Sequence, residues 1–209
     1  MMWLGVRYGR FAVPVACAML VALVAGCDAT PGNEAGDNNG PTPEQRAFFD
    51  NIKAKCGQAF GGRTVLAPEG DEVFEPARLY FIVEECTDDE LRIPFVVGDD
   101  ASRTWILRLG DDGLSFIHEH LRDDGSEYEG SGFGGHATTD GSATFQSFED
   151  YWATADTPEA EYRVWRLRMD RERDLFVYYL DRGGEPAYRL VFYLGPPSPA
   201  LPEEHATGR

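Results

Sequence analysis

Beyond residue 60, large apolar side chains recur at every second position over short segments, and this period constrains the fold more than any other feature. A period of two places side chains on one face of a β-strand, whereas an amphipathic helix needs a period near 3.6. Leu79, Phe81 and Val83 show the alternation clearly. It predicts strands over residues 62–67, 77–86, 91–97, 103–109, 114–121, 162–169, 174–181 and 187–194.

Tight turns separate these segments. They carry the Asp and Gly residues that short hairpin connections favour, namely Asp111-Asp112-Gly113, Asp123-Asp124-Gly125, Asp140-Gly141 and Arg182-Gly183-Gly184. Short strands joined in this way form antiparallel meanders. We therefore predict one mainly β domain of about eight strands, either a single antiparallel up-and-down barrel or a sandwich.

Two stretches interrupt the alternation. The Gly-rich stretch 130–135 is expected to cross the mouth of a barrel. The segment 148–161 contains Phe148, Tyr151 and Trp152, and we expect it to form a short helix.

A longer helix is predicted before the first strand. Thr42 and Gln45 have the spacing of a capping box, in which each side chain accepts a hydrogen bond from the backbone of the other residue. Gly57 is expected to end the helix. Residues four apart share one helix face, and the stripe that we expect to be buried consists of Phe48, Ile52 and Cys56.

The junction between this helix and the first strand, Gly57-Gln58-Ala59-Phe60-Gly61-Gly62, resembles the start of calycin barrels, the lipocalins and their bacterial relatives. In that family a helix and a Gly-x-Trp or Trp-x-Gly motif precede the meander. Phe60 stands where the family usually has Trp. The resemblance implies a calycin-like barrel, and small barrels of this kind are wide enough to hold one ligand.

A second resemblance covers most of residues 46–194. The chain is similar there to a group of uncharacterised exported bacterial proteins. That group brings no established activity, so the resemblance implies a shared fold only. The residues that carry it are Phe48-Phe49-Asp50-Asn51, Cys56-Gly57-x-Ala59-Phe60, Glu85-Cys86, Arg92-Ile93-Pro94-Phe95 and Arg103-Thr104-Trp105.

The first 27 residues predict export. Two arginines precede an apolar run from Phe11 to Ala25 that has the length of a signal-peptide core and is short for a membrane-spanning helix. The run ends in Val24-Ala25-Gly26-Cys27, which resembles the bacterial lipobox. We therefore predict a signal peptide over 1–26 and lipidation of Cys27. An ordinary cleaved signal and an uncleaved anchor helix are the alternatives.

These features predict a lipoprotein of the bacterial cell envelope, anchored in a membrane and facing the periplasm. Asp28 resembles the inner-membrane retention signal of enterobacterial lipoproteins. Residues 27–41 are rich in Gly, Asn, Asp and Pro, and we expect a flexible tether there. The barrel-like domain is expected over 42–195, followed by a Pro-rich, disordered tail over 196–209.

The net charge of the chain limits the classes of partner that we expect. Loss of the two signal-peptide arginines from 19 basic residues leaves 17 against 36 acidic ones, so the formal net charge moves from −17 to −19. Such a surface repels nucleic acid phosphates, and we expect no nucleic acid partner. It is compatible with a cationic protein or a divalent cation, and also with solubility alone. We expect a monomer.

The four cysteines have different expected roles. Cys17 leaves with the signal peptide and Cys27 takes the lipid, which leaves Cys56 and Cys86 as a pair. A pair of cysteines in an exported protein is more often a disulfide than a metal or catalytic site. We predict a disulfide that contributes on the order of 3 kcal/mol by the chain-entropy estimate.

The histidines are the first candidate site. His118 and His120 share one face of a predicted strand, and with His136 they could supply three nitrogen ligands to zinc or copper. In the alternative interpretation, His118 and His120 form hydrogen bonds with carboxylates near a strand end. The only cofactor that the sequence suggests is therefore a divalent metal.

Arginines beside aromatic rings are the second candidate site. Arg92, Arg103 and Trp105 could hold the carboxylate and the apolar body of a ligand, although such arginines more often pair with acidic residues. A separate basic cluster is interpreted as a solvated face balanced by Glu159, Glu161 and Asp170. Its members are Arg163, Arg166, Arg168, Arg171 and Arg173.

No nucleophile elbow, phosphate-binding loop, dinucleotide motif or calcium loop is found in the sequence, so an enzyme is not the leading expectation. The leading hypothesis is a membrane-anchored binding module for a small apolar or amphipathic ligand. The alternative is an acidic inhibitor or partner of a cationic envelope protein. A histidine–metal protein is the third hypothesis.

Overall fold

A computed structural model describes residues 40–128, 130–138, 141–152 and 161–195 of the 209-residue chain. The predicted signal peptide, the lipidation at Cys27, most of the predicted tether and the predicted tail lie outside these residues. No helix among the described residues is long and apolar enough to cross a membrane.

The described residues form one helix and eleven strands. The helix α1 spans Pro43–Lys53. The strands are β1 (Ala59–Leu66), β2 (Leu79–Ile82), β3 (Glu85–Cys86), β4 (Glu90–Val97), β5 (Asp100–Gly110), β6 (Gly113–His120), β7 (Phe133–Ala137), β8 (Phe145–Trp152), β9 (Glu161–Asp170), β10 (Leu175–Arg182) and β11 (Glu185–Tyr193).

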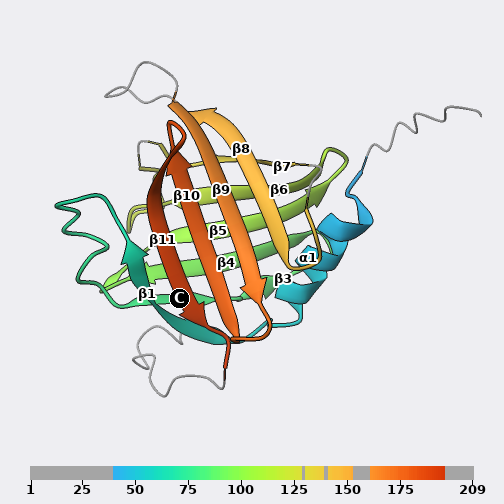
Figure 1. The fold of residues 1–209 in the computed structure, drawn as a ribbon, viewed down its shortest axis with the longest axis horizontal. Coiled ribbons are helices and arrows are strands. Elements are labelled where there is room, and N and C mark those ends of the chain that lie inside the picture. Colours follow the sequence, from blue (N-terminus) through green and yellow to red (C-terminus); the bar gives the residue numbers. More distant parts are fainter. Residues whose placement is uncertain (1–39, 129, 139–140, 153–160, 196–209) are drawn as a thin grey trace, which may run out of the picture. The chain divides into compact units, whose positions relative to one another are not determined.

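The strands form a closed antiparallel barrel (Figure 1). From β3 to β11 each strand pairs with the next along the chain, β11 pairs with β1, and β1 pairs with β2. The ring closes because β2 also pairs with β4. Since β2 and β3 lie one after the other along β4, the eleven strands make a ten-stranded barrel. The predicted mainly β barrel with an N-terminal helix is confirmed.

Two strands were not predicted. In β7 two of five residues are glycine, so the apolar alternation that would reveal a strand is missing. In β8, Phe145 and Phe148 are three residues apart, a spacing that also occurs in helices. Every residue of β8 nevertheless pairs with β9, so the predicted helix is wrong for residues 148–152; residues 153–160 lie outside the described chain.

The barrel turns sharply between β7 and β8. Only two residue pairs join these strands, and β8 to β11 cross β4 to β7 at a steep angle in Figure 1. Glycine lets β7 approach both neighbouring strands closely: a Cβ on Gly135 would overlap the Glu149 backbone of β8, and one on Gly134 would overlap the Phe116 carbonyl oxygen of β6. Residues 133–135 of the Gly-rich stretch belong to β7 and residues 130–132 to the turn before it, so over its second half a strand replaces the predicted crossing of the mouth.

Helix α1 covers one end of the barrel. Its capping box between Thr42 and Gln45 is present as predicted. Phe48, Phe49 and Ile52 are buried, and the helix packs against β5, β6 and β8. The Gln45 side chain also accepts a hydrogen bond from the Leu114 backbone at the start of β6.

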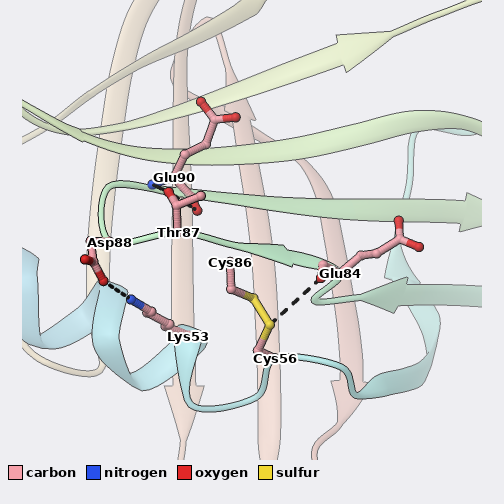
Figure 2. The surroundings of a disulfide bond; sticks show 7 residues. All are labelled: Lys53, Cys56, Glu84, Cys86, Thr87, Asp88 and Glu90. Carbon is pink, nitrogen blue, oxygen red and sulfur yellow. Dashed lines mark hydrogen bonds and ion pairs between the residues drawn. A yellow bond between two sulfur atoms is a disulfide. The ribbon is translucent and has the colours of Figure 1, made fainter.

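The helix ends at Lys53 rather than at Gly57, so Cys56 lies in the turn beyond it and not on the buried stripe. There Cys56 forms a disulfide with Cys86 of β3, with 6.3 Å between the Cα atoms (Figure 2). The predicted pairing is confirmed. Together with the ion pair between Lys53 Nζ and Asp88 at 2.7 Å, it ties the helix to the strands that close the barrel.

Candidate functional site

A cavity of about 220 Å³ lies inside the barrel, at the end opposite α1. Strand β6 runs from one end of the barrel to the other: it begins beside α1 with Leu114 and ends in the cavity with His118 and His120. We call this end the mouth. Aromatic residues make up much of the lining, which consists of Phe74, Phe95, Arg103, Trp105, His118, His120, Phe133, Arg163, Tyr178, Leu180, Arg182, Tyr188 and Leu190.

The walls of the cavity are stacked rings, some from neighbouring strands and some from strands across the barrel. Trp105 on β5 stacks on Phe95 of β4 with ring centroids 4.3 Å apart, and it lies parallel to Tyr178 of β10 at 5.2 Å. His118 on β6 stacks on Phe133 of β7 at 4.4 Å. Inward side chains alternate with outward ones along each strand, and this alternation brings rings from five strands to one place.

His118 and Tyr178 form a buried polar pair in this wall. His118 Nε2 lies 3.2 Å from the Tyr178 hydroxyl. Burial lowers the pKa of His118 to about 3, and the Arg163 charge adds to this effect while the Phe133 backbone opposes it. Burial also raises the pKa of Tyr178 well above its usual range. Both groups are therefore uncharged at neutral pH, and together they offer hydrogen-bonding capacity without charge.

Three guanidinium groups lie at the mouth. Arg103 pairs with Asp100, whereas Arg163 and Arg182 both pair with Glu161. Two of the guanidiniums also lie over rings: Arg163 Cζ is 6.0 Å from the centre of Phe133, and Arg103 Cζ is 5.9 Å from that of Phe74. The entrance thus places guanidinium groups beside aromatic rings, an arrangement that suits an amphipathic molecule.

The connection between β1 and β2, residues 67–78, reaches over the mouth. Phe74 lies against Tyr188, with ring centroids 5.2 Å apart, and the Tyr188 hydroxyl donates a hydrogen bond to Asp71 at 2.6 Å. Burial and this hydrogen bond raise the pKa of Tyr188 to about 12. The contact therefore persists through the neutral pH range and holds Phe74 at the cavity.

The structure separates the predicted ligand-binding residues. Arg103 and Trp105 line the cavity. Arg92 alternates with the buried Leu91 and Ile93 and so faces outward, where it pairs with Glu119 and Glu90. It follows the alternative interpretation, pairing with acidic residues, because its strand position is one residue out of phase with the inward face.

The three histidines do not come together. Register places His136 opposite Ser115, on the outer face of the barrel, while His118 and His120 point inward. His120 stacks on Tyr128 at 4.0 Å, and neither inward histidine has a carboxylate bonded to its ring among the described residues. No group of three His, Cys, Asp or Glu side chains in the described part of the chain is arranged to hold a metal.

Most of the aromatic and aliphatic lining residues were not predicted as site residues, and neither were two arginines of the lining, Arg163 and Arg182. The sequence places Arg163 in the basic cluster and Arg182 in a predicted turn. In the structure Arg163 lies on the same face of β9 as Trp165, two residues away, which is the signal that could have placed it inside. Arg166 and Arg168 face outward, as predicted.

No family model, no characterised protein and no solved structure matches this chain.

Proposed function

We propose that this chain is a membrane-anchored envelope lipoprotein whose barrel binds one small amphipathic molecule. The observation that supports the proposal is the cavity itself, since it combines stacked aromatic walls, an uncharged polar pair and guanidinium groups at one open end. Ligand sites generally join apolar surface to a few placed polar groups.

The volume of the cavity sets the size of the ligand. Pockets for drug-sized ligands have volumes of about 300 Å³ or more, and an apolar cavity of about 150 Å³ holds one benzene ring. At about 220 Å³ the cavity suits one ring with a short substituent, or a chain of similar bulk. A long lipid would not fit within the barrel.

The binding proposal can be tested with an uncharged aromatic probe. We expect 4-fluorobenzyl alcohol to bind the full chain at one site, observed by ¹⁹F NMR titration. Leu180→Trp places a larger side chain in the cavity and should weaken binding at least tenfold, as expected when a steric block replaces a fitted pocket. Val65→Trp, at a position 44% exposed and absent from the cavity lining, is the matched control and should leave binding unchanged.

Equal effects of the two Trp substitutions would contradict the proposed site. If this probe does not bind in a Leu180-dependent way, the proposal falls.

A further inference from the structure

We propose that the ligand of this cavity carries a hydroxyl group, which reaches the floor of the cavity and forms a hydrogen bond with the pair of His118 and Tyr178. This inference rests on the proposed binding function and specifies the chemical class of the ligand. It depends on the depth of the pair, on its capacity for hydrogen bonds and on the rings around it.

The pair lies at the floor of the cavity. Tyr178 and Arg182 both line it, and Tyr178 lies four residues, or about 13 Å of strand, further from the mouth on β10. The next residue on the same face, Phe176, is buried and does not line the cavity. On β6 the lining likewise includes His118 and not Phe116. The cavity therefore ends at the pair on both strands.

The pair is polar but uncharged. Both residues line the cavity, so the contact of 3.2 Å between His118 Nε2 and the Tyr178 hydroxyl lies in its wall. At neutral pH neither group is ionised, because burial lowers the pKa of His118 to about 3 and raises the pKa of Tyr178. A charged group of a ligand would find no countercharge on this pair, whereas a hydroxyl group needs none.

The Tyr178 oxygen has room for one more hydrogen bond. A phenol offers one O–H donor and two acceptor lone pairs. Among the described residues His118 uses one of these three positions, and the Trp165 indole, which opposes the rise in the pKa of Tyr178, accounts for a second. The third is a lone pair if Tyr178 donates to His118, and the O–H if it accepts from His118. A hydroxyl group both donates and accepts, so it fits either arrangement.

Aromatic rings surround the pair and define the place of the carbon skeleton. Trp105 lies parallel to Tyr178, and Phe133 stacks on His118. All four rings line the cavity, so a ligand whose hydroxyl group reaches the pair has its skeleton among them. With about 220 Å³ available, that skeleton is a single ring or a short chain. A phenol or a small aromatic alcohol matches these features.

4-Fluorophenol and 4-fluorotoluene test this inference, because they share a fluorinated ring and differ only in a hydroxyl or a methyl group of similar size. Transfer out of water favours 4-fluorotoluene, since burial of a hydroxyl group without a hydrogen bond is unfavourable. We nevertheless expect the full chain at pH 7 to bind 4-fluorophenol at least about fivefold more tightly, which one hydrogen bond of ordinary strength provides. ¹⁹F NMR titration measures both affinities.

Tyr178→Phe removes the hydroxyl group of the pair and keeps the ring. This variant should lose the preference for 4-fluorophenol and still bind 4-fluorotoluene. Tyr179→Phe, on the outer face of the same strand, is the matched control and should keep the preference.

The wild-type preference alone keeps the test decisive if Tyr178→Phe fails to fold. Equal or weaker binding of 4-fluorophenol by the wild type would overturn the hydroxyl assignment while leaving the cavity as a binding site for 4-fluorotoluene. Retention of the preference in Tyr178→Phe would also overturn it, since a polar group elsewhere would then hold the hydroxyl. Loss of all Leu180-dependent binding is the separate result that removes the proposed function.

Discussion

His118 shows how one buried residue links the cavity to the stability of the barrel. Its ring lies between Phe116 and Phe133, and its pKa is lowered to about 3 by burial. In the unfolded chain a histidine has a pKa of about 6.5. Folding therefore favours the uncharged ring, and the stability that follows is complete above pH 6.5 and is lost as the pH falls toward 3.

We expect the free energy of unfolding to fall by about 2 kcal/mol between pH 6.5 and 4.5, since one proton is taken up on unfolding. Carboxylates with lowered pKa values, such as Asp71 and Asp100, add their losses mainly below about pH 4, so this window isolates the histidines. Urea unfolding at several pH values measures the slope. His118→Gln should flatten it, whereas His136→Gln on the outer face should not.

Parallel pH curves for the wild type and His118→Gln would contradict the role of His118 in acid sensitivity.

The residues of the cavity were only partly predictable from the sequence. Trp105 and Arg103 were found because an arginine near a tryptophan on one strand face is a local pattern. Arg182 could not be found in this way, since its partner Glu161 is 21 residues away and the two meet only through the β9–β10 hairpin. The sequence could not decide whether the Arg92 side chain faces into or out of the barrel, because alternation alone does not say which face of a strand meets the core.

Among the elements, the corner between β7 and β8 governs how the barrel folds back on itself. Strands with large apolar side chains were predictable, because a period of two is visible within a few residues. β7 was not, because glycine at Gly134 and Gly135 removes the side chains that carry the period. What favours a strand there is the close approach of neighbouring backbones, a tertiary feature.

We expect Gly135→Ala to lower the free energy of unfolding by about 1–3 kcal/mol, since its Cβ would overlap the Glu149 backbone and force the strands apart. Gly110→Ala is the matched control, because a Cβ there would meet nothing closer than the Asp112 nitrogen at 4.0 Å and should cost little. Urea unfolding of both variants checks the prediction. Similar stabilities of Gly135→Ala and the wild type would show that the corner can relax at little cost.

At the scale of the whole molecule, the class of fold followed from the number of predicted strands and from the turns between them. Closure of the ring could not be predicted, because β2 pairs with β4 past the short strand β3, which depends on an interruption of the strand at residues 83–84. The existence of a cavity was also beyond prediction from the sequence, because it depends on how the inward side chains of ten barrel positions fill the space.

The expected envelope location also belongs to the whole molecule. We expect the full chain, expressed in a bacterium, to incorporate labelled palmitate and to yield a mature protein that begins at Cys27 and carries three acyl chains, which together anchor it stably. Cys27→Ser should incorporate none. Cys17→Ser, which lies within the predicted signal peptide, is the matched control and should be labelled normally. Labelling of Cys27→Ser, or none of the wild type, would contradict the lipoprotein assignment.

The position of α1 gives the barrel an orientation. The chain enters the domain through residue 42 at the covered end, and the mouth lies at the other end. A solute would therefore enter the cavity from the end away from residue 42, past Phe74 and the guanidinium groups of the mouth. Loading of the cavity would then depend on the concentration of that solute in the fluid around the mouth.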